Sequence, residues 1–157
     1  MLSDKPKGLK AKRRYYQGIV SDKIKQQARD NGQEAVIKKN GMAVKGITYR
    51  KWGYYQVLHD EDGFSVKKLV ILPGRTLSDQ RHFKRAEHWL VVEGDLTVDL
   101  EGPAASQTVE VRAASQTEGT LRIGPKIWHR PHNKTNKNVV VIETWLGNST
   151  EEDIERR

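Results

Sequence analysis

Residues 74–94 read GRTLSDQRHFKRAEHWLVVEG, and this stretch decides the fold class and points to a site. Gln80 and His82 are two positions apart, so their side chains leave the same face if the segment is extended. Glu87 begins the strand that follows, and a short turn at 83–86 would fold it back beside them. We therefore expect these three polar side chains to meet next to an apolar strand.

Short apolar runs continue this pattern from about residue 49 onward. They are rich in Val, Ile, Leu and Thr and are separated by Gly, Pro and Asn: VKKLVILPG (66–74), HWLVVEGDLTVDL (88–100), TVEVR (108–112), GTLRIG (119–124) and NVVVIETWLG (138–147). Repeated short strands with turn signals and no long helical period predict an all-β sandwich or double-sheet barrel. We expect this domain to span residues 49–157.

The first quarter of the chain is different because it is strongly basic. Residues 1–41 hold 11 Lys and Arg against 4 Asp and Glu, which accounts for most of the net charge of +8. We expect residues 1–48 to form a partly flexible extension with a short helix at about 21–31 and a hairpin at about 34–47, around Asn40-Gly41. A basic arm can contact the phosphates of a nucleic acid, but it is more often a solvated extension.

Composition and length exclude several classes of protein. The 157 residues include no cysteine, which rules out disulfides and thiolate metal sites and fits a reducing cytoplasm. No run approaches the ~20 apolar residues of a membrane span. The start, MLSDKPKGLKAKRR, lacks the apolar centre of a secretory signal. We expect a cytoplasmic protein with one domain of ordinary size.

A second histidine cluster lies in LRIGPKIWHRPHN, residues 121–133. His129 in this segment is placed to add a fourth ligand to the first group. Oxygen and imidazole ligands without sulfur suit Zn, Mn, Fe, Co or Ni, and spacing does not choose among them. The structural alternative is a set of hydrogen-bonded polar residues near strand ends. Trp128 precedes His129 and is expected at the mouth of the site.

The same residues carry a resemblance to a known family. The spacing from Gly74 through Gln80-x-His82 and Glu87 to Gly94 resembles the first cupin motif, with Gln in place of its first His. QRHFKRAEHWLVVEG (80–94) resembles the QxHxHRxEHW(I/V)VVSG segment of type II phosphomannose isomerases. Further likeness runs over about residues 50–156, in RKWGYYQVL (50–58), FSVKK (64–68), IGPKIWHRPHN (123–133) and the closing segment from Ile142 to Ile154. The resemblance implies a cupin jelly roll, that is, a double-stranded β-helix.

The resemblance also implies a reaction and its ligands. One divalent metal ion would be held by Gln80, His82, Glu87 and His129. The reaction would be the interconversion of mannose 6-phosphate and fructose 6-phosphate, in which the metal acts as a Lewis acid at the carbonyl and hydroxyl oxygens. The substrate partner is thus a small sugar phosphate.

Five further residues receive roles on the same basis. Arg85 would hold the phosphate or stabilise the enediolate, and Lys67 would be a second anion clamp or a proton carrier. Glu143 and His88 are further candidates for the base. Lys84 stands where the family usually has a His and is a further substrate-binding candidate.

Other functions stay open. Lys84 and the altered turn Gly124-Pro125-Lys126 favour a non-catalytic cupin that binds a sugar or small anion through its metal. A cupin dioxygenase typically has three His and one Glu, which Gln80 opposes. A nucleic-acid function would use the basic arm, and its binding would fall steeply with salt. We expect a homodimer that pairs through strand or sheet contacts, with the Asn40-Gly41 hairpin as a candidate.

Overall fold

The computed structural model describes residues 34–39, 42–113, 119–147 and 151–157. Within these ranges the regular structure is almost entirely β. The strands are, in chain order, β1 (Glu34–Lys39), β2 (Met42–Arg50), β3 (Gly53–Glu61), β4 (Phe64–Ile71), β5 (Gln80–His82), β6 (Ala86–Glu93), β7 (Asp95–Glu101), β8 (Ser106–Arg112), β9 (Thr120–Ile123), β10 (Trp128–His132), β11 (Val139–Leu146) and β12 (Ile154–Arg156). A single 3-10 turn, η1 (Glu151–Asp153), precedes β12. The all-β expectation is confirmed.

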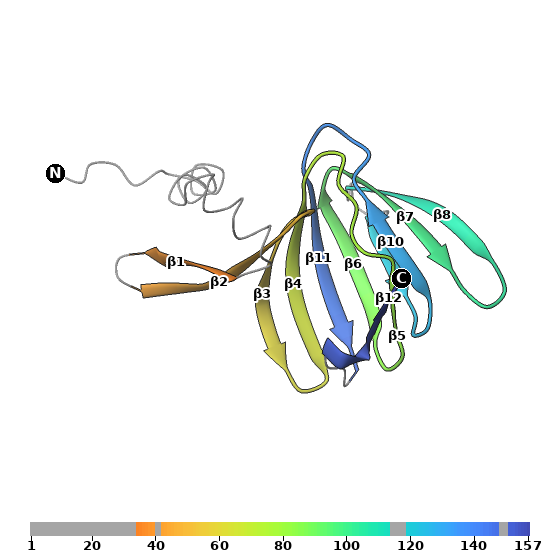
Figure 1. Cartoon of the computed structure of the whole chain (residues 1–157), viewed down its shortest axis with the longest axis horizontal. Coiled ribbons are helices and arrows are strands. Elements are labelled where there is room, and N and C mark those ends of the chain that lie inside the picture. The colour runs from red at the N-terminus through yellow and green to blue at the C-terminus, as the bar shows by residue number, and fades with distance from the viewer. Residues whose placement is uncertain (1–33, 40–41, 114–118, 148–150) are drawn as a thin grey trace.

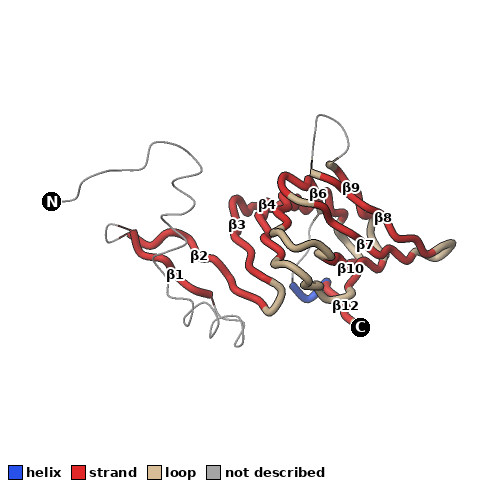
Figure 2. The backbone as a smooth tube through the Cα atoms, turned by 90° about the horizontal axis from the view of Figure 1, so that it is seen from above, coloured by secondary structure: helices blue, strands red, loops and turns tan. Residues whose placement is uncertain are grey.

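The strands form two antiparallel sheets. One has seven strands in the order β1-β2-β3-β4-β11-β6-β9, and the other has five in the order β12-β5-β10-β7-β8. Figures 1 and 2 show the two sheets around a common interior, with β1 and β2 extending to one side. This arrangement is consistent with the expected jelly roll.

The strand sequences alternate as a half-buried sheet requires. Along β6 the buried positions are Glu87, Trp89 and Val91, while the residues between them are exposed. The core is made of buried apolar side chains from both sheets: Leu69, Ile71, Leu77, Trp89, Val91, Leu96, Val98, Leu100, Val111, Ile123, Val139 and Val141. Each such Val or Leu contributes about 1.5–3 kcal/mol through burial. The same inward face that builds the core carries Glu87.

Two connections pass the chain between the sheets near this face. The turn at 83–85 leads from β5 in the smaller sheet to β6 in the larger one. Gly94 leads from β6 to β7 with a φ of +79°, and a Cβ there would lie 2.8 Å from the carbonyl oxygen of Asn138. Glycine is required at such a position because it alone combines a left-handed backbone with no side chain. The short turn at 83–85 brings β5 and the start of β6 together across the interior.

The structure describes only part of the N-terminal quarter, for which we expected a helix and a hairpin. The helix expected at 21–31 and the Asn40-Gly41 pair lie outside the described residues. The strands on either side of that pair, β1 and β2, are antiparallel and match Lys39 with Met42. The expected domain boundary at 48/49 falls inside β2, which continues to Arg50. The boundary therefore stays a prediction. Across the described ranges, no helix has the length and apolar character needed to span a bilayer.

Candidate metal centre

Three side chains from three strands converge in the interior. His82 ends β5, Glu87 lies at the start of β6, and His129 lies in β10; one ligand atom from each falls within 4.8 Å of the others. All three side chains are buried, with exposed fractions of 2% or less. The structure brings His82, Glu87 and His129 together, and their role as metal ligands stays a prediction.

The ring of His129 is fixed by its own chain segment. Its Nδ1 lies 2.9 Å from the carbonyl oxygen of Ile127. Because a carbonyl only accepts, Nδ1 must be the donor, and Nε2 is left facing Glu87 Oε2 at 3.4 Å. A histidine that donates its outer N–H to a backbone carbonyl, with the other nitrogen turned inward, is oriented as metal-ligating histidines usually are.

The carboxylate of Glu87 is the anionic centre of the group. It accepts hydrogen bonds from Trp89 Nε1 at 3.1 Å and from the Arg85 guanidinium at 2.8 Å, and it lies 2.9 Å from His82 Nε2. Burial raises the pKa of Glu87, but its interactions with His129 and His82 outweigh this and hold it well below its ordinary value. Glu87 is therefore ionised, in an interior that favours a cation beside it.

The donor set fits a divalent cation. His129 Nε2, which faces Glu87, is buried and has no hydrogen-bond partner, which is rare in folded interiors. Burial lowers the pKa of His129, but its interaction with Glu87 raises it above the ordinary value. The same attraction that favours a proton on Nε2 favours a metal there, because proton and metal compete for one lone pair. Two imidazoles and one carboxylate are also the donors that zinc and similar ions take.

Gln80, the expected fourth ligand, lies next to this group. It is the direct cross-strand neighbour of His129 in the pairing of β5 with β10. Its side chain is half-buried, and its Oε1 accepts a hydrogen bond of 3.2 Å from the Ser78 hydroxyl. The backbone thus brings Gln80 beside His129, and its role as a ligand stays a prediction.

Two cations accompany the cluster and share one aromatic ring. Arg85 is 2% exposed, and its guanidinium carbon lies 3.5 Å from the centre of the Trp145 ring. Lys67 on β4 places its Nζ 3.7 Å from the same ring and 4.9 Å from that of Tyr55. Cation–π contacts of this kind are strongest where water is excluded. The predicted candidates Arg85, which is buried, and Lys67, which is half-buried, are thus brought together on one ring.

Glu143 is a second buried acid on the same side of the larger sheet. Glu143 lies on β11, and its cross-strand neighbours are Lys67 of β4 and Trp89 of β6. Burial raises the pKa of Glu143 to about 7, with repulsion from Glu87 adding to it and attraction to Lys67 and Arg85 opposing it. A carboxyl group with this pKa can both accept and return a proton near neutrality.

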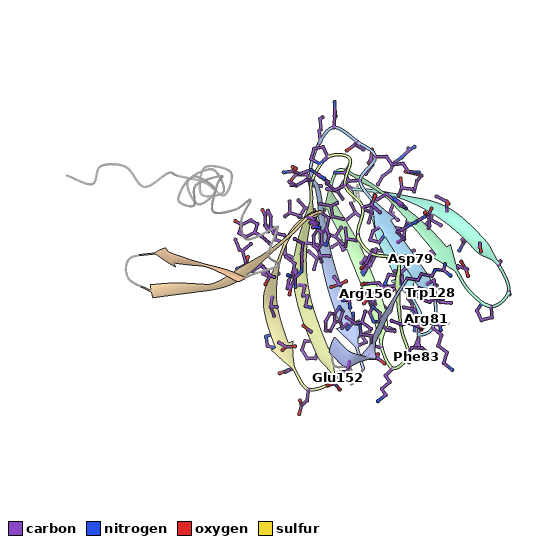
Figure 3. All side chains as sticks on the ribbon, viewed as in Figure 1. Asp79, Arg81, Phe83, Trp128, Glu152 and Arg156 are labelled. Atoms are coloured by element: carbon purple, nitrogen blue, oxygen red, sulfur yellow. The ribbon has the colours of Figure 1, made fainter. Side chains whose placement is uncertain are left out.

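Three expected residues are not part of the interior group. For His88 the structure corrects the prediction. Its side chain is exposed on the outer face of β6, opposite to that of its neighbour Glu87, so it is not placed to act as the base. The side chain of Lys84 is exposed, and its backbone N–H donates to Asp153 at 3.1 Å. Trp128 is also a correction, because it faces outward from β10. Its ring contacts the guanidinium group of Arg81 (Figure 3) and also that of Arg157.

Trp145 was missed as a site residue. Glu143 and Trp145 are two positions apart in NVVVIETWLG, so they leave the same face of the strand as the buried Val141. This alternation was available in the sequence. The contact of Trp145 with Arg85 was not, because it depends on the pairing of β11 with β6, which matches Trp145 with Glu87.

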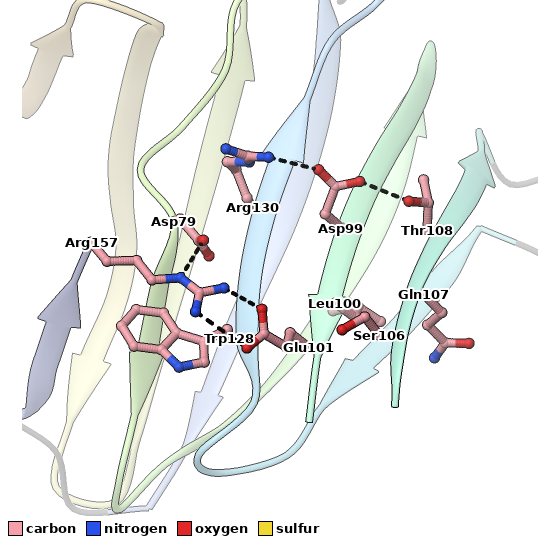
Figure 4. Close-up of a pocket in the computed structure, with 10 residues that line it drawn as sticks. All are labelled: Asp79, Asp99, Leu100, Glu101, Ser106, Gln107, Thr108, Trp128, Arg130 and Arg157. Carbon is pink, nitrogen blue, oxygen red and sulfur yellow. Dashed lines mark hydrogen bonds and ion pairs between the residues drawn. The ribbon is translucent and has the colours of Figure 1, made fainter. Parts of the chain in front are cut away.

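A separate open hollow of about 480 Å³ lies on the outer face of the smaller sheet (Figure 4). Its lining is polar and includes Arg157, which bonds Asp79 and Glu101, and Arg130, which bonds Asp99. None of the cluster residues lines it. Its charged groups are paired with one another, and the Trp128 ring is covered by arginines. The hollow is therefore distinct from the candidate metal centre.

A model of a known protein family matches most of this chain. The family model for the mannose-6-phosphate isomerase C-terminal domain matches residues 37–157, which include every residue of the cluster.

Two curated relatives are similar to two thirds of this chain. A mannose-1-phosphate guanylyltransferase of Salmonella muenchen is 30% identical over 105 residues, which cover 67% of this chain and 20% of that protein. The xanthan biosynthesis protein XanB of Xanthomonas campestris pv. campestris is 34% identical over 105 residues, covering 67% and 21%. The chain spans about a fifth of the length of these two relatives.

Solved structures support the fold. The capsular polysaccharide assembling protein CapF of Staphylococcus aureus superposes with a TM-score of 0.61 at 16% identity, over 73% of this chain and 34% of that one. An oxalate decarboxylase of Lactobacillus farciminis gives 0.60 at 16% identity, over 70% and 32%. At these identities the likeness concerns the architecture alone.

Proposed function

Because this chain belongs to the family of mannose-6-phosphate isomerase C-terminal domains, which are cupins, we propose that it is a metal-dependent isomerase of mannose 6-phosphate and fructose 6-phosphate. The observation that carries the proposal is the convergence, in one interior, of the His82–Glu87–His129 group with Arg85, Lys67 and Glu143. An aldose–ketose isomerase needs an electrophile, a base and a cation for the phosphate. Each of these has a candidate here.

His82, Glu87 and His129 would hold the metal ion, with Gln80 as the fourth ligand. Such an ion, when bound, supplies Lewis acidity toward the oxygens at C1 and C2 of the sugar. Trp89 keeps Glu87 in place through its indole N–H, and Ile127 does the same for His129. The apolar core beneath them excludes water, which strengthens every charge interaction above it.

Glu143 is the candidate for the proton carrier. The reaction moves the proton of C2 to C1, while a proton passes between the two oxygens. A single carboxyl group can take the carbon-bound proton and return it to the neighbouring carbon. In the metal-free protein its pKa of about 7 leaves comparable amounts of both protonation states near neutral pH. Its burial, and the cations Lys67 and Arg85 near it, support this role over that of the outward-facing His88.

Lys67 and Arg85 are the candidates for the substrate's phosphate. Both side chains are held against the Trp145 ring, so they are already ordered before substrate binds. Binding a phosphate therefore costs them little further side-chain entropy. The planar guanidinium of Arg85 suits two oxygens of a phosphate at once, and the ammonium of Lys67 suits a single point of negative charge.

A coupled assay tests this function. The protein is stripped with a chelator and reloaded in turn with Zn, Mn, Fe, Co or Ni. Fructose 6-phosphate formed from mannose 6-phosphate is then measured beside the metal content. We expect turnover with at least one ion at one metal per chain, and none in the stripped protein. Stoichiometric metal without turnover for any of the five ions would reject the isomerase.

A non-catalytic cupin that binds a sugar phosphate through its metal is the second candidate. Two observations favour it: Arg85 is almost fully buried, and the turn that carries Lys126 departs from the family pattern with a φ of 66°. Calorimetric binding of mannose 6-phosphate to the metal-loaded protein, without turnover, would support this second function.

A further inference from the structure

We propose that Arg85 is an exchangeable internal cation: its guanidinium and the divalent metal take the same two atoms, His82 Nε2 and Glu87 Oε1, one at a time. This inference rests on the metal centre of the proposed function. It adds an order to the reaction, in which metal binding releases Arg85 from Glu87 and makes it available to the substrate.

The contacts of one nitrogen atom carry the inference. Arg85 Nη2 lies 3.0 Å from His82 Nε2 and 2.8 Å from Glu87 Oε1, and these two atoms are themselves 2.9 Å apart. Arg85 Nε reinforces the pairing at 3.1 Å from the same carboxylate oxygen. Arg85 Nη2 is thus within hydrogen-bond distance of both atoms that a metal would take. A guanidinium and a metal ion on the same lone pairs would also repel each other strongly in a dry interior.

In the metal-free protein the contact between Arg85 and Glu87 neutralises a buried charge. Glu87 is 1% exposed and ionised, and a buried carboxylate without a cation costs several kcal/mol. Arg85 supplies that cation and keeps the two ligand side chains in position. A divalent metal can replace it because the metal brings the larger charge to the same oxygen.

The Trp145 ring can continue to bind the Arg85 guanidinium after it separates from Glu87. Its guanidinium carbon already lies 3.5 Å from the centre of the Trp145 ring, so a small shift across that ring keeps the cation–π contact. The freed N–H donors then face the interior beside Lys67, which contacts the same ring. This is where a phosphate or another substrate anion would be attracted.

Zinc calorimetry on the full chain tests the competition. We expect Arg85→Met to bind Zn²⁺ at least tenfold more tightly than the wild type, because the metal no longer has to displace a cation. Lys67→Met is the matched control: it removes one positive charge from the same ring. If competition for atoms is the cause, its affinity should stay within about threefold of the wild type. Equal gains in both variants would reduce the effect to general charge and overturn the proposal.

Loss of Arg85 leaves a buried carboxylate unpaired and can destabilise the fold, so a second measurement uses the wild type. The Nε–H of Arg85 gives a side-chain signal in ¹H–¹⁵N spectra, assigned by its loss in Arg85→Lys. We expect this signal to move during a zinc titration and to stop moving at one ion per chain. A signal that stays unchanged while zinc binds would show that Arg85 keeps its contacts, and would overturn the exchange.

The two measurements separate this inference from the function on which it rests. If the wild type binds zinc with Arg85 unmoved and Arg85→Met binds no more tightly, the exchange is wrong and the metal centre stands. If neither the wild type nor Arg85→Met binds zinc, the centre itself is wrong and the exchange falls with it.

Discussion

The Nδ1 atom of His129 lies 2.9 Å from the carbonyl oxygen of Ile127, and this contact turns Nε2 of the same ring toward Glu87. The ring is fixed before any ligand binds, because both partners belong to one short segment of chain. His129 is therefore oriented toward the cluster by its own chain segment, and it is the first residue to vary.

We predict that His129→Ala loses stoichiometric zinc, since a remainder of His82, Glu87 and Gln80 holds a divalent ion much more weakly. His132→Ala is the matched control in the same strand. Its ring bonds Asp99 at 2.7 Å and Thr76 at 3.1 Å rather than the cluster. Elemental analysis after gel filtration should find one ion per chain in the control and almost none in His129→Ala. A full metal complement in His129→Ala would contradict the assignment of the site.

The second prediction concerns the charge of the proposed fourth ligand. Gln80 is neutral, so Glu87 would be the only anionic ligand and the ion would keep high Lewis acidity. Gln80→Glu should bind metal at least as tightly but lower kcat, because added negative charge opposes the charge that develops on the substrate oxygens. Calorimetry and steady-state kinetics check the two halves separately. A faster variant would mean that this electrostatic reasoning has the wrong sign.

The third prediction uses the raised pKa of Glu143. The folded value is about 7 against an ordinary value of 4.5, so between these pH values the folded state holds more protons than the unfolded chain. Stability from this group is therefore complete below about pH 4.5, falls as pH rises to about 7, and is level above that.

Glu143→Gln should remove that loss, which is on the order of 3 kcal/mol for a shift of this size. Urea unfolding from pH 5 to pH 8, in chelator so that metal does not contribute, measures it. The free energy of unfolding of the variant should rise relative to the wild type as pH increases. A difference between the two proteins that does not change with pH would contradict the assigned pKa.

The fourth prediction concerns the turn that departs from the family pattern. Lys126 has a φ of 66°, and its N–H donates to the carbonyl oxygen of His82 at 2.6 Å. A left-handed backbone costs a residue with a side chain about 1–2 kcal/mol, and glycine avoids this. Lys126→Gly should raise the midpoint of thermal unfolding by roughly 2–4 °C. A lower midpoint would show that the lysine side chain contributes more than its backbone strain costs.

Much of the centre could be predicted because its residues are close in sequence. Gln80, His82 and Glu87 lie within eight positions around one turn, so strand alternation and a tight turn suffice to bring them together. His129 could be added because the second cluster matched a family segment. The β architecture followed from the apolar runs and their turn residues, whereas the helix expected at 21–31 lies outside the described residues.

The two corrections come from the same alternation that placed the ligands. If Glu87 points inward, His88 must point outward, and if His129 points inward, Trp128 must point outward. The sequence therefore contained both answers. The contact between Arg85 and Trp145 is different, because it depends on which strands β11 pairs with. That long-range pairing has no local signal, and it joins residues 60 positions apart.

The most direct measurement of the central claim follows mannose 6-phosphate by NMR in the presence of metal-loaded wild type and metal-loaded Glu143→Gln, with equal metal content confirmed for both. We predict that fructose 6-phosphate accumulates with the wild type and forms at least a hundredfold more slowly with the variant, as expected when a general base is removed. If mannose 6-phosphate stays unchanged with the metal-loaded wild type, this interior is not the active site of an isomerase.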